Sequence, residues 1–349
     1  MNNIKSSPAV FCCLFAFILV TVVGCKYETI VEDTDYQSPF QDIFEATVKG
    51  SGNDIRYFVV KGVDINTKDK SGATPLHYAV KQCNVDNMKH LIANGANVNA
   101  KSNDGKTPLH LAANDHSSMD VVECLITNGA DVNAKDKNGA MPLHLTSKQR
   151  DIDIGVMEYL IANGAEVSAK ADDGRTPLHF AARDSNYLDA LKCLVANGAD
   201  VNAKEKDGKT PLHYATLESS VLAVECLVTN GAEINVKDND GMMPIFYAVR
   251  QYNLPMSQRN VDITKYLITH GVNVNTRTDK GATPLHFVSA ADSNVYTDNF
   301  YIDILKLLIE RDADVTVKNE NGKTPLDVAS TEEKKVVIRE AGGTSGEEL

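Results

Sequence analysis

A four-residue pattern, most often Thr-Pro-Leu-His, recurs eight times in this 349-residue chain. The copies begin at residues 74, 107, 141, 176, 210, 243, 283 and 324, so successive intervals are 33, 34, 35, 34, 33, 40 and 41 residues. A glycine shortly precedes every copy. A period near 33 residues indicates an array of stacked units and overrides the length-based expectation of about two globular domains.

Each repeat carries the signals of two helices. Thr followed by Pro suits a helix start, because Thr can cap free backbone N–H groups and Pro lacks the donor that the first turn leaves unpaired. A second helix follows with apolar residues at helical spacing, as in residues 121–126, and ends at Asn128-Gly129. One such unit cannot bury its apolar face alone, so the sequence predicts an all-α repeat solenoid.

These residues resemble the ankyrin repeat, whose TPLHxA and NGADVNAxDxxG elements recur over about residues 41–343. The resemblance implies a stack of about nine units including degenerate caps, the first beginning at Gln41 and the last having Asp327 in place of His. Most internal repeats lack the Gly-His usual between the two helices, as at Cys83-Asn84, which leaves the geometry of that turn open. Residues 344–349 are expected to form a disordered tail.

The N-terminus is unlike the repeats. After Lys5, residues 9–23 are almost wholly apolar, which is too short for a comfortable membrane span of about 20 residues and is typical of a secretory signal at residues 1–24. Val22-Val23-Gly24-Cys25 resembles the lipobox of bacterial lipoproteins, which implies an acylated Cys25, an acidic tether over residues 25–40 and, because Lys26 follows, an outer-membrane location. Two alternatives are an ordinary cleavage site, giving a secreted chain, and an uncleaved single-span anchor.

Composition and motifs argue against catalysis and against nucleic acid. The net charge of −12 repels phosphate backbones. No nucleotide-binding, hydrolase or zinc-protease motif occurs, so we expect no cofactor, no metal and no small-molecule substrate, and a monomer. The six histidines of the tetrapeptide are interpreted as structural, since neighbouring units are too far apart to share an ion. Cysteines 83, 124, 193 and 226 are expected to be small core residues, with an exposed thiol as the alternative.

The resemblance also implies a partner-binding surface made of the hairpin tips and the exposed side of each first helix. Because charges of both signs occur there, we expect no single-sign field to steer the partner. Carried over position by position, the candidate residues are Lys70, Ser71, Lys81, Gln82, Asn103, Asp104, Lys106, Asn114, Asp115, Lys137, Lys148, Asp172, Asp173, Arg175, Arg183, Asp184, Lys206, Lys209, Glu218, Asn239, Met242, Arg250 and Gln251.

The two longest intervals predict two long loops between first and second helices, at residues 252–260 and 292–300. Long loops are tolerated thermodynamically and often carry function. Their apolar side chains form a hypothetical second contact patch, with folding back onto the stack as the alternative; these residues are Tyr252, Leu254, Met256, Val295, Tyr296, Phe300 and Tyr301.

The sequence therefore predicts a non-catalytic scaffold in the bacterial cell envelope that binds a protein partner of unknown identity. Within this class, an inhibitor or immunity-type protein that neutralises a toxin or envelope enzyme is a narrower alternative. A secreted effector acting on host proteins and an enzyme with an unrecognised site are two further alternatives.

Overall fold

The computed structural model describes residues 36–348 except 115–117, 149–152, 250–256 and 292–297. The contacts between residues separate the chain into two compact units, the second of which begins at Ser38 and contains the helices. Its described residues contain helices and turns but no strand. The predicted all-α repeat fold is confirmed.

In the described part of the chain, eighteen α-helices follow one another as nine pairs. The first helices of the pairs are α1 (Ile43–Lys49), α3 (Pro75–Lys81), α5 (Pro108–Asn114), α7 (Pro142–Thr146), α9 (Pro177–Ala181), α11 (Pro211–Leu217), α13 (Pro244–Val249), α15 (Pro284–Ala290) and α17 (Pro325–Val328). The second helices are α2 (Gly52–Val60), α4 (Val85–Ala93), α6 (Met119–Thr127), α8 (Ile154–Ala162), α10 (Leu188–Ala196), α12 (Val221–Thr229), α14 (Gln258–Thr269), α16 (Asp298–Glu310) and α18 (Glu332–Glu340). A short 3-10 turn, η2 (Ser185–Tyr187), precedes α10.

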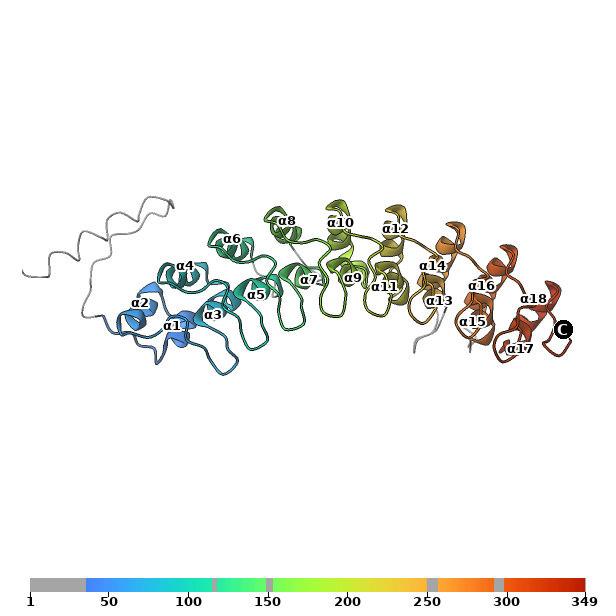
Figure 1. The fold of residues 1–349 in the computed structure, drawn as a ribbon, viewed down its shortest axis with the longest axis horizontal. Helices are drawn as coiled ribbons and strands as arrows, with labels where there is room; N and C mark the ends of the chain where they lie inside the picture. Colours follow the sequence, from blue (N-terminus) through green and yellow to red (C-terminus); the bar gives the residue numbers. More distant parts are fainter. Residues whose placement is uncertain (1–35, 115–117, 149–152, 250–256, 292–297, 349) are drawn as a thin grey trace, which may run out of the picture. The chain divides into compact units, whose positions relative to one another are not determined.

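The helices stack in two layers. First helices contact the first helices of the next pair, as α3 contacts α5, and second helices likewise contact second helices, as α4 contacts α6. Loops that end in tight turns project from the first-helix side and join each pair to the next (Figure 1). Every unit therefore rests only on its neighbours, as expected for a solenoid.

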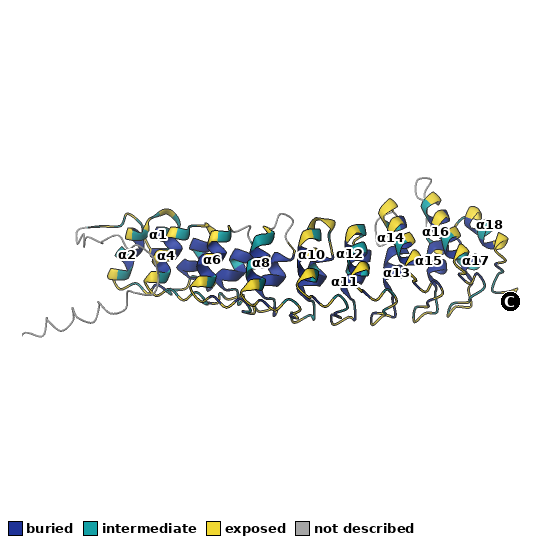
Figure 2. Cartoon of the chain, turned by 90° about the horizontal axis from the view of Figure 1, so that it is seen from above, coloured by how far each residue is buried: buried dark blue, intermediate teal, exposed yellow. Residues whose placement is uncertain are grey.

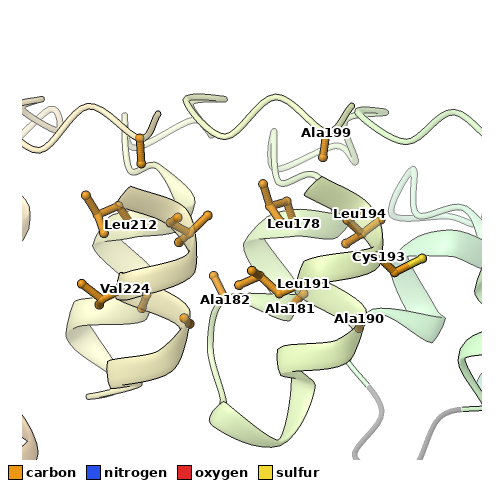
Figure 3. Close-up of a cluster of buried hydrophobic side chains, with 14 of the residues drawn as sticks. Leu178, Ala181, Ala182, Ala190, Leu191, Cys193, Leu194, Ala199, Leu212 and Val224 are labelled. Atoms are coloured by element: carbon orange, nitrogen blue, oxygen red, sulfur yellow. The ribbon is translucent and has the colours of Figure 1, made fainter. Parts of the chain in front are cut away.

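The core lies between the two layers and between successive pairs, where the facing sides of the helices are buried (Figure 2). Figure 3 shows one section of it, in which Leu178 of α9, Leu191 and Leu194 of α10, and Leu212 of α11 are all inaccessible to solvent. Each such leucine contributes about 1.5–3 kcal/mol by its burial. The periodic leucines thus fix the spacing of the stack.

The ends of the array differ from its interior. At the start, Asp42 caps α1 by accepting a hydrogen bond from the Glu45 amide. At the end, where the sequence predicts a disordered tail, residues 344–348 return to the last unit: the Thr324 hydroxyl donates to the Thr344 carbonyl at 2.9 Å, and the Gly346 amide donates to Asp327 at 2.8 Å. Asp327, which replaces the usual His, holds this segment.

Candidate protein-binding surface

The histidines of the tetrapeptide tie each unit to the next. In the second unit, the Thr74 amide donates to Nδ1 of His77 at 3.1 Å, so the ring proton resides on Nε2. That nitrogen then donates to the Lys106 carbonyl in the following loop, also at 3.1 Å. The same arrangement recurs at residues 110, 144, 179, 213 and 286. The predicted structural role is confirmed.

Burial keeps these histidines neutral. It lowers the pKa of all six, to about 4 for His179 and His213, although the hydrogen bond to the neighbouring carbonyl opposes the shift in each case. A neutral ring can accept at Nδ1 and donate at Nε2 simultaneously, whereas an imidazolium can only donate. The inter-unit contact therefore requires the uncharged form.

Backbone hydrogen bonds join the loop tips into a ladder, with a gap between the tips at residues 238–242 and 278–282. The Asn103 amide donates to the Ser71 carbonyl at 2.8 Å, the Lys137 amide to the Asp104 carbonyl at 2.9 Å, and the pattern continues at residues 172, 206, 239 and 320. The tips approach so closely that a Cβ on Gly72, whose φ is +76°, would lie 2.5 Å from Oδ1 of Asn103. These bonds hold the backbone of the tips, and the Asn103 and Asn239 side chains add bonds to the carbonyls of Lys70 and Lys206 while remaining exposed.

Most of the predicted contact residues lie on this surface. Exposed members are Lys70, Ser71, Lys81, Gln82, Asn103, Asp104, Lys137, Lys148, Asp172, Arg183, Lys206, Glu218 and Asn239. Half-buried members are Lys106, Asn114, Asp173, Arg175, Asp184 and Lys209. Three further members, Asp115, Arg250 and Gln251, lie outside the described residues, as does Cys25.

Met242 is not available as a surface residue. Its side chain is only 6% exposed and belongs to the core, and its carbonyl accepts the hydrogen bond from His213 at 3.2 Å. The apolar thioether gains more from burial than from exposure, in contrast to the charged residues that occupy the same repeat position at Lys106, Arg175 and Lys209. The prediction of an exposed contact at Met242 was wrong.

The burial of the four cysteines differs in part from the prediction that all of them are core residues. Cys124 and Cys193 are buried and Cys226 is half-buried, but Cys83 is exposed. Cys83 stands in the turn between α3 and α4 with a φ of +52°, where the family has glycine, so its side chain points away from the stack. It is a turn residue and not a core residue.

The second patch is only partly a loop. Helices α14 and α16 contain 12 and 13 residues, whereas the other second helices contain 9, so residues 258–260 and 298–300 are helical. Tyr301 is inaccessible and Phe300 is half-buried, which removes Tyr301 from any contact surface. The remaining members, Tyr252, Leu254, Met256, Val295 and Tyr296, lie outside the described residues.

Between the first two complete repeats the surface forms a shallow cavity of about 280 Å³. Its lining includes four predicted contact residues, Ser71, Lys81, Asp104 and Lys106, together with Tyr78 and Leu111. Tyr78 and Leu111 are not among the predicted contact residues, because nearly all of those residues are polar or charged. The residue directly after each tetrapeptide, which is apolar in every copy, was the available signal.

Tyr78 is held by a carboxylate at the base of the loop. Its hydroxyl donates to Oδ2 of Asp69 at 2.8 Å, and the amides of Ser71 and Ala73 donate to Oδ1 of the same residue. Burial raises the pKa of Asp69, but the hydrogen bonds from Ser71, Tyr78 and the two amides outweigh it and lower the pKa overall. Asp69 is therefore ionised, and its carboxylate oxygens are occupied by hydrogen bonds within the loop and to Tyr78.

Two properties of the described residues limit the chemistry of the surface. No group of three or more His, Cys, Asp or Glu side chains there is placed to hold a metal ion. Over the same residues, no helix combines the length and the apolar character that a membrane span requires.

Comparison with known families places the chain. A family model for ankyrin repeats in three copies matches residues 43–136, 114–205, 182–277, 223–319 and 256–339, which together cover most of the chain. The protein is an ankyrin-repeat protein and belongs to this family. A search of curated proteins finds no match.

Proposed function

We propose that the chain is a non-catalytic scaffold that binds a protein partner through its loop tips and the exposed face of its first helices. The observation that carries the proposal is the backbone ladder of the tips, which fixes a row of exposed side chains such as Lys70, Asn103 and Asp104. A surface whose backbone is already ordered loses little conformational entropy on binding. Membership of the ankyrin-repeat family supports the same reading.

We further propose that the scaffold acts in a bacterial cell envelope, anchored through acylation of Cys25. The support is the short apolar segment at residues 9–23 and the lipobox-like residues that end at Cys25. Several acyl chains provide stable anchoring where a single chain is marginal. On this reading the repeats are displayed beside the membrane.

Partner binding is tested by affinity capture from envelope extract with the full chain as bait. One variant carries Lys70→Ala, Asn103→Ala and Asp104→Ala at the tips, and a matched control carries Asp120→Ala, Glu123→Ala and Glu158→Ala on exposed or half-buried positions of the second helices. We expect a specific protein to be retained by the unaltered chain and the control but lost by the tip variant. A protein retained equally by all three would contradict the proposed surface.

Anchoring is tested separately by fractionation. Cys25→Ala should move the chain from the detergent-soluble membrane fraction to the aqueous fraction, and mass spectrometry of the unaltered protein should show an acylated N-terminal Cys25. An unmodified Cys25, or a membrane fraction unchanged by Cys25→Ala, would rule out the lipid anchor without affecting the proposed binding surface.

A further inference from the structure

Three lysines gather on the first-helix face of consecutive units. Lys81 ends α3, Lys106 precedes α5 and Lys148 follows α7 by two residues. Lys81 and Lys148 share one repeat position, seven residues after the start of the tetrapeptide. Lys106 directly precedes the first residue of its tetrapeptide, Thr107. Lys81 and Lys106 line the same cavity, so these two repeat positions share one face. We call these three residues the lysine cluster.

Within the part of the chain that the structure describes, the lysine cluster has no internal counter-ion. Among the described residues, none of its three ammonium groups donates a hydrogen bond or forms an ion pair. The corresponding cations of the next two units are paired: Arg175 with Asp173, Arg183 with Glu218 at 3.1 Å and Lys209 with Asp207 at 3.9 Å. Opposite charges therefore neutralise the face around α9 and α11 but leave it basic around α3, α5 and α7.

Lys106 also repels Lys148 within the cluster. Partial burial lowers the pKa of Lys148, repulsion from Lys106 and Arg175 lowers it further, and attraction by Asp136 opposes these effects. The Asp136 carboxylate is already occupied, because its Oδ1 accepts from the amides of Asn138 and Ala140. An incoming anion would further offset the repulsion between Lys106 and Lys148, which Asp136 opposes.

Apolar surface lies beside the charges. Tyr78 and Leu111 line the cavity together with Lys81 and Lys106, and both are half-buried. Asp104 is the one carboxylate among the lining residues, against two ammonium groups. A bound segment can thus place carboxylates on the lysines and a small apolar side chain on the Tyr78–Leu111 floor.

The spacing of the cluster sets the length of the segment. Helices of neighbouring units pack about 8–10 Å apart. A chain in the polyproline II conformation rises about 3.1 Å per residue with three residues per turn, so one unit corresponds to about three residues and every third side chain lies on the same face. Three lysines over three units then match carboxylates placed about three residues apart. Nucleic acid fits less well, because its closely spaced phosphates would also meet the acidic tips at Asp104, Asp136 and Asp172.

We propose that the lysine cluster is the docking site for an acidic peptide segment of the protein partner in the extended polyproline II conformation, about seven residues long with carboxylates at every third position. This inference rests on the proposed binding function and names the chemistry of the partner. Charge complementarity fixes the register of the segment, and the apolar floor receives the residue between two carboxylates.

The inference is tested with a fluorescently labelled peptide, Glu-Leu-Ser-Glu-Leu-Ser-Glu, titrated with the full chain at low salt. The control peptide has Gln at all three Glu positions. One variant carries Lys81→Gln, Lys106→Gln and Lys148→Gln, and its matched control carries Lys70→Gln, Lys137→Gln and Lys206→Gln at exposed loop tips. Circular dichroism confirms that both variants keep the helical fold.

We expect the acidic peptide to bind about tenfold more tightly than its Gln form, the lysine-cluster variant to lose that margin, and the tip-lysine control to keep it. Equal binding of the two peptides, or equal loss in both variants, would overturn the inference. So would an oligothymidylate probe that competes through the same three lysines at lower concentration. If the captured partner is lost with the tip variant but not with the lysine-cluster variant, the proposed function stands and this inference falls.

Discussion

At the scale of single residues, backbone conformation decides which side chains the repeat accepts. The residue two positions after the second helix adopts a left-handed conformation, and eight units place glycine there, namely Gly62, Gly95, Gly129, Gly164, Gly198, Gly231, Gly271 and Gly342. The remaining unit, the eighth along the chain, has Asp312, with a φ of +62°. A Cβ meets nothing within 4 Å at any of the eight glycines, so the cost at Asp312 arises in the backbone and not from crowding.

Replacing Asp312 by glycine should therefore stabilise the C-terminal units. We expect the free energy of unfolding to rise by about 0.5–1 kcal/mol, because relief of the left-handed strain exceeds the extra chain entropy of glycine. The Asp312 carbonyl, which accepts from Asn275, is retained in the variant. Urea unfolding followed by circular dichroism measures the change.

The matched reverse variant is Gly231→Asp, which introduces the same residue at the same repeat position of another unit. It should lower the free energy of unfolding by a similar amount. Stabilisation by Gly231→Asp, or destabilisation by Asp312→Gly, would show that side-chain interactions and not backbone strain control this position.

At the scale of elements, the last helix is locked to the preceding unit by a buried lysine. Lys334 of α18 is inaccessible to solvent, its Nζ donates to the Ala291 carbonyl at 2.7 Å and to the Ser330 hydroxyl at 3.1 Å, and it lies 4.7 Å from the ring centre of Tyr301. Ala291 is the C-cap of α15, where backbone carbonyls lack helical partners. The ammonium group therefore closes the end of one helix from another.

Lys334→Met keeps the apolar stem but removes the donor. We expect a loss of about 1–3 kcal/mol, because a buried carbonyl loses a charge-assisted hydrogen bond. Hydrogen exchange should accelerate in α17 and α18 and remain unchanged in the units before α13, since each unit depends on its neighbours. Lys335→Met is the control: Lys335 pairs with Glu332 at the surface, where such pairs contribute little. Equal effects of the two substitutions would refute the lock.

Element starts were predictable to different degrees. First helices begin where Thr-Pro predicts, because Pro and the cap depend on local chemistry alone. The longer second helices were predicted as loops over part of their length. There, Ser257 and Asn260 form a capping box that lets α14 begin earlier, and the pattern of intervals reveals an insertion but not where its helix starts.

At the scale of the whole molecule, the repeat period was sufficient to predict the stack, because each unit buries its face against a neighbour of the same kind. The charge pattern of the surface was not predictable in the same way. The sequence predicts charges of both signs on the surface but does not show which cations are paired. Arg183, for example, pairs with Glu218 of the next unit, which is 35 residues away in the chain. Such pairings depend on inter-unit geometry and not on local sequence.

The six buried histidines predict acid sensitivity of the whole array. Their folded-state pKa values lie below the ordinary value of 6.5, so the unfolded chain binds more protons as the pH falls. The stabilisation is fully present above pH 6.5 and is lost as the pH falls towards about 4, the pKa of His179 and His213. Each of these two shifts corresponds to about 3 kcal/mol at most.

Urea midpoints measured between pH 8 and pH 4.5 should therefore stay level above about pH 7 and fall steadily below about pH 6.5. The carboxylates of Asp69, Asp173 and Asp327, whose pKa values are lowered from 3.8, act only below this range. A double variant, Thr210→Met with His213→Phe, copies the residues that the next unit has at Met243 and Phe246. It should make the pH dependence shallower by the share of one of the six histidines, whereas substitution of the exposed His270 by Gln should leave the slope unchanged. A midpoint that holds until pH 4.5, or the same slope in the double variant, would show that neutral histidines do not couple the units.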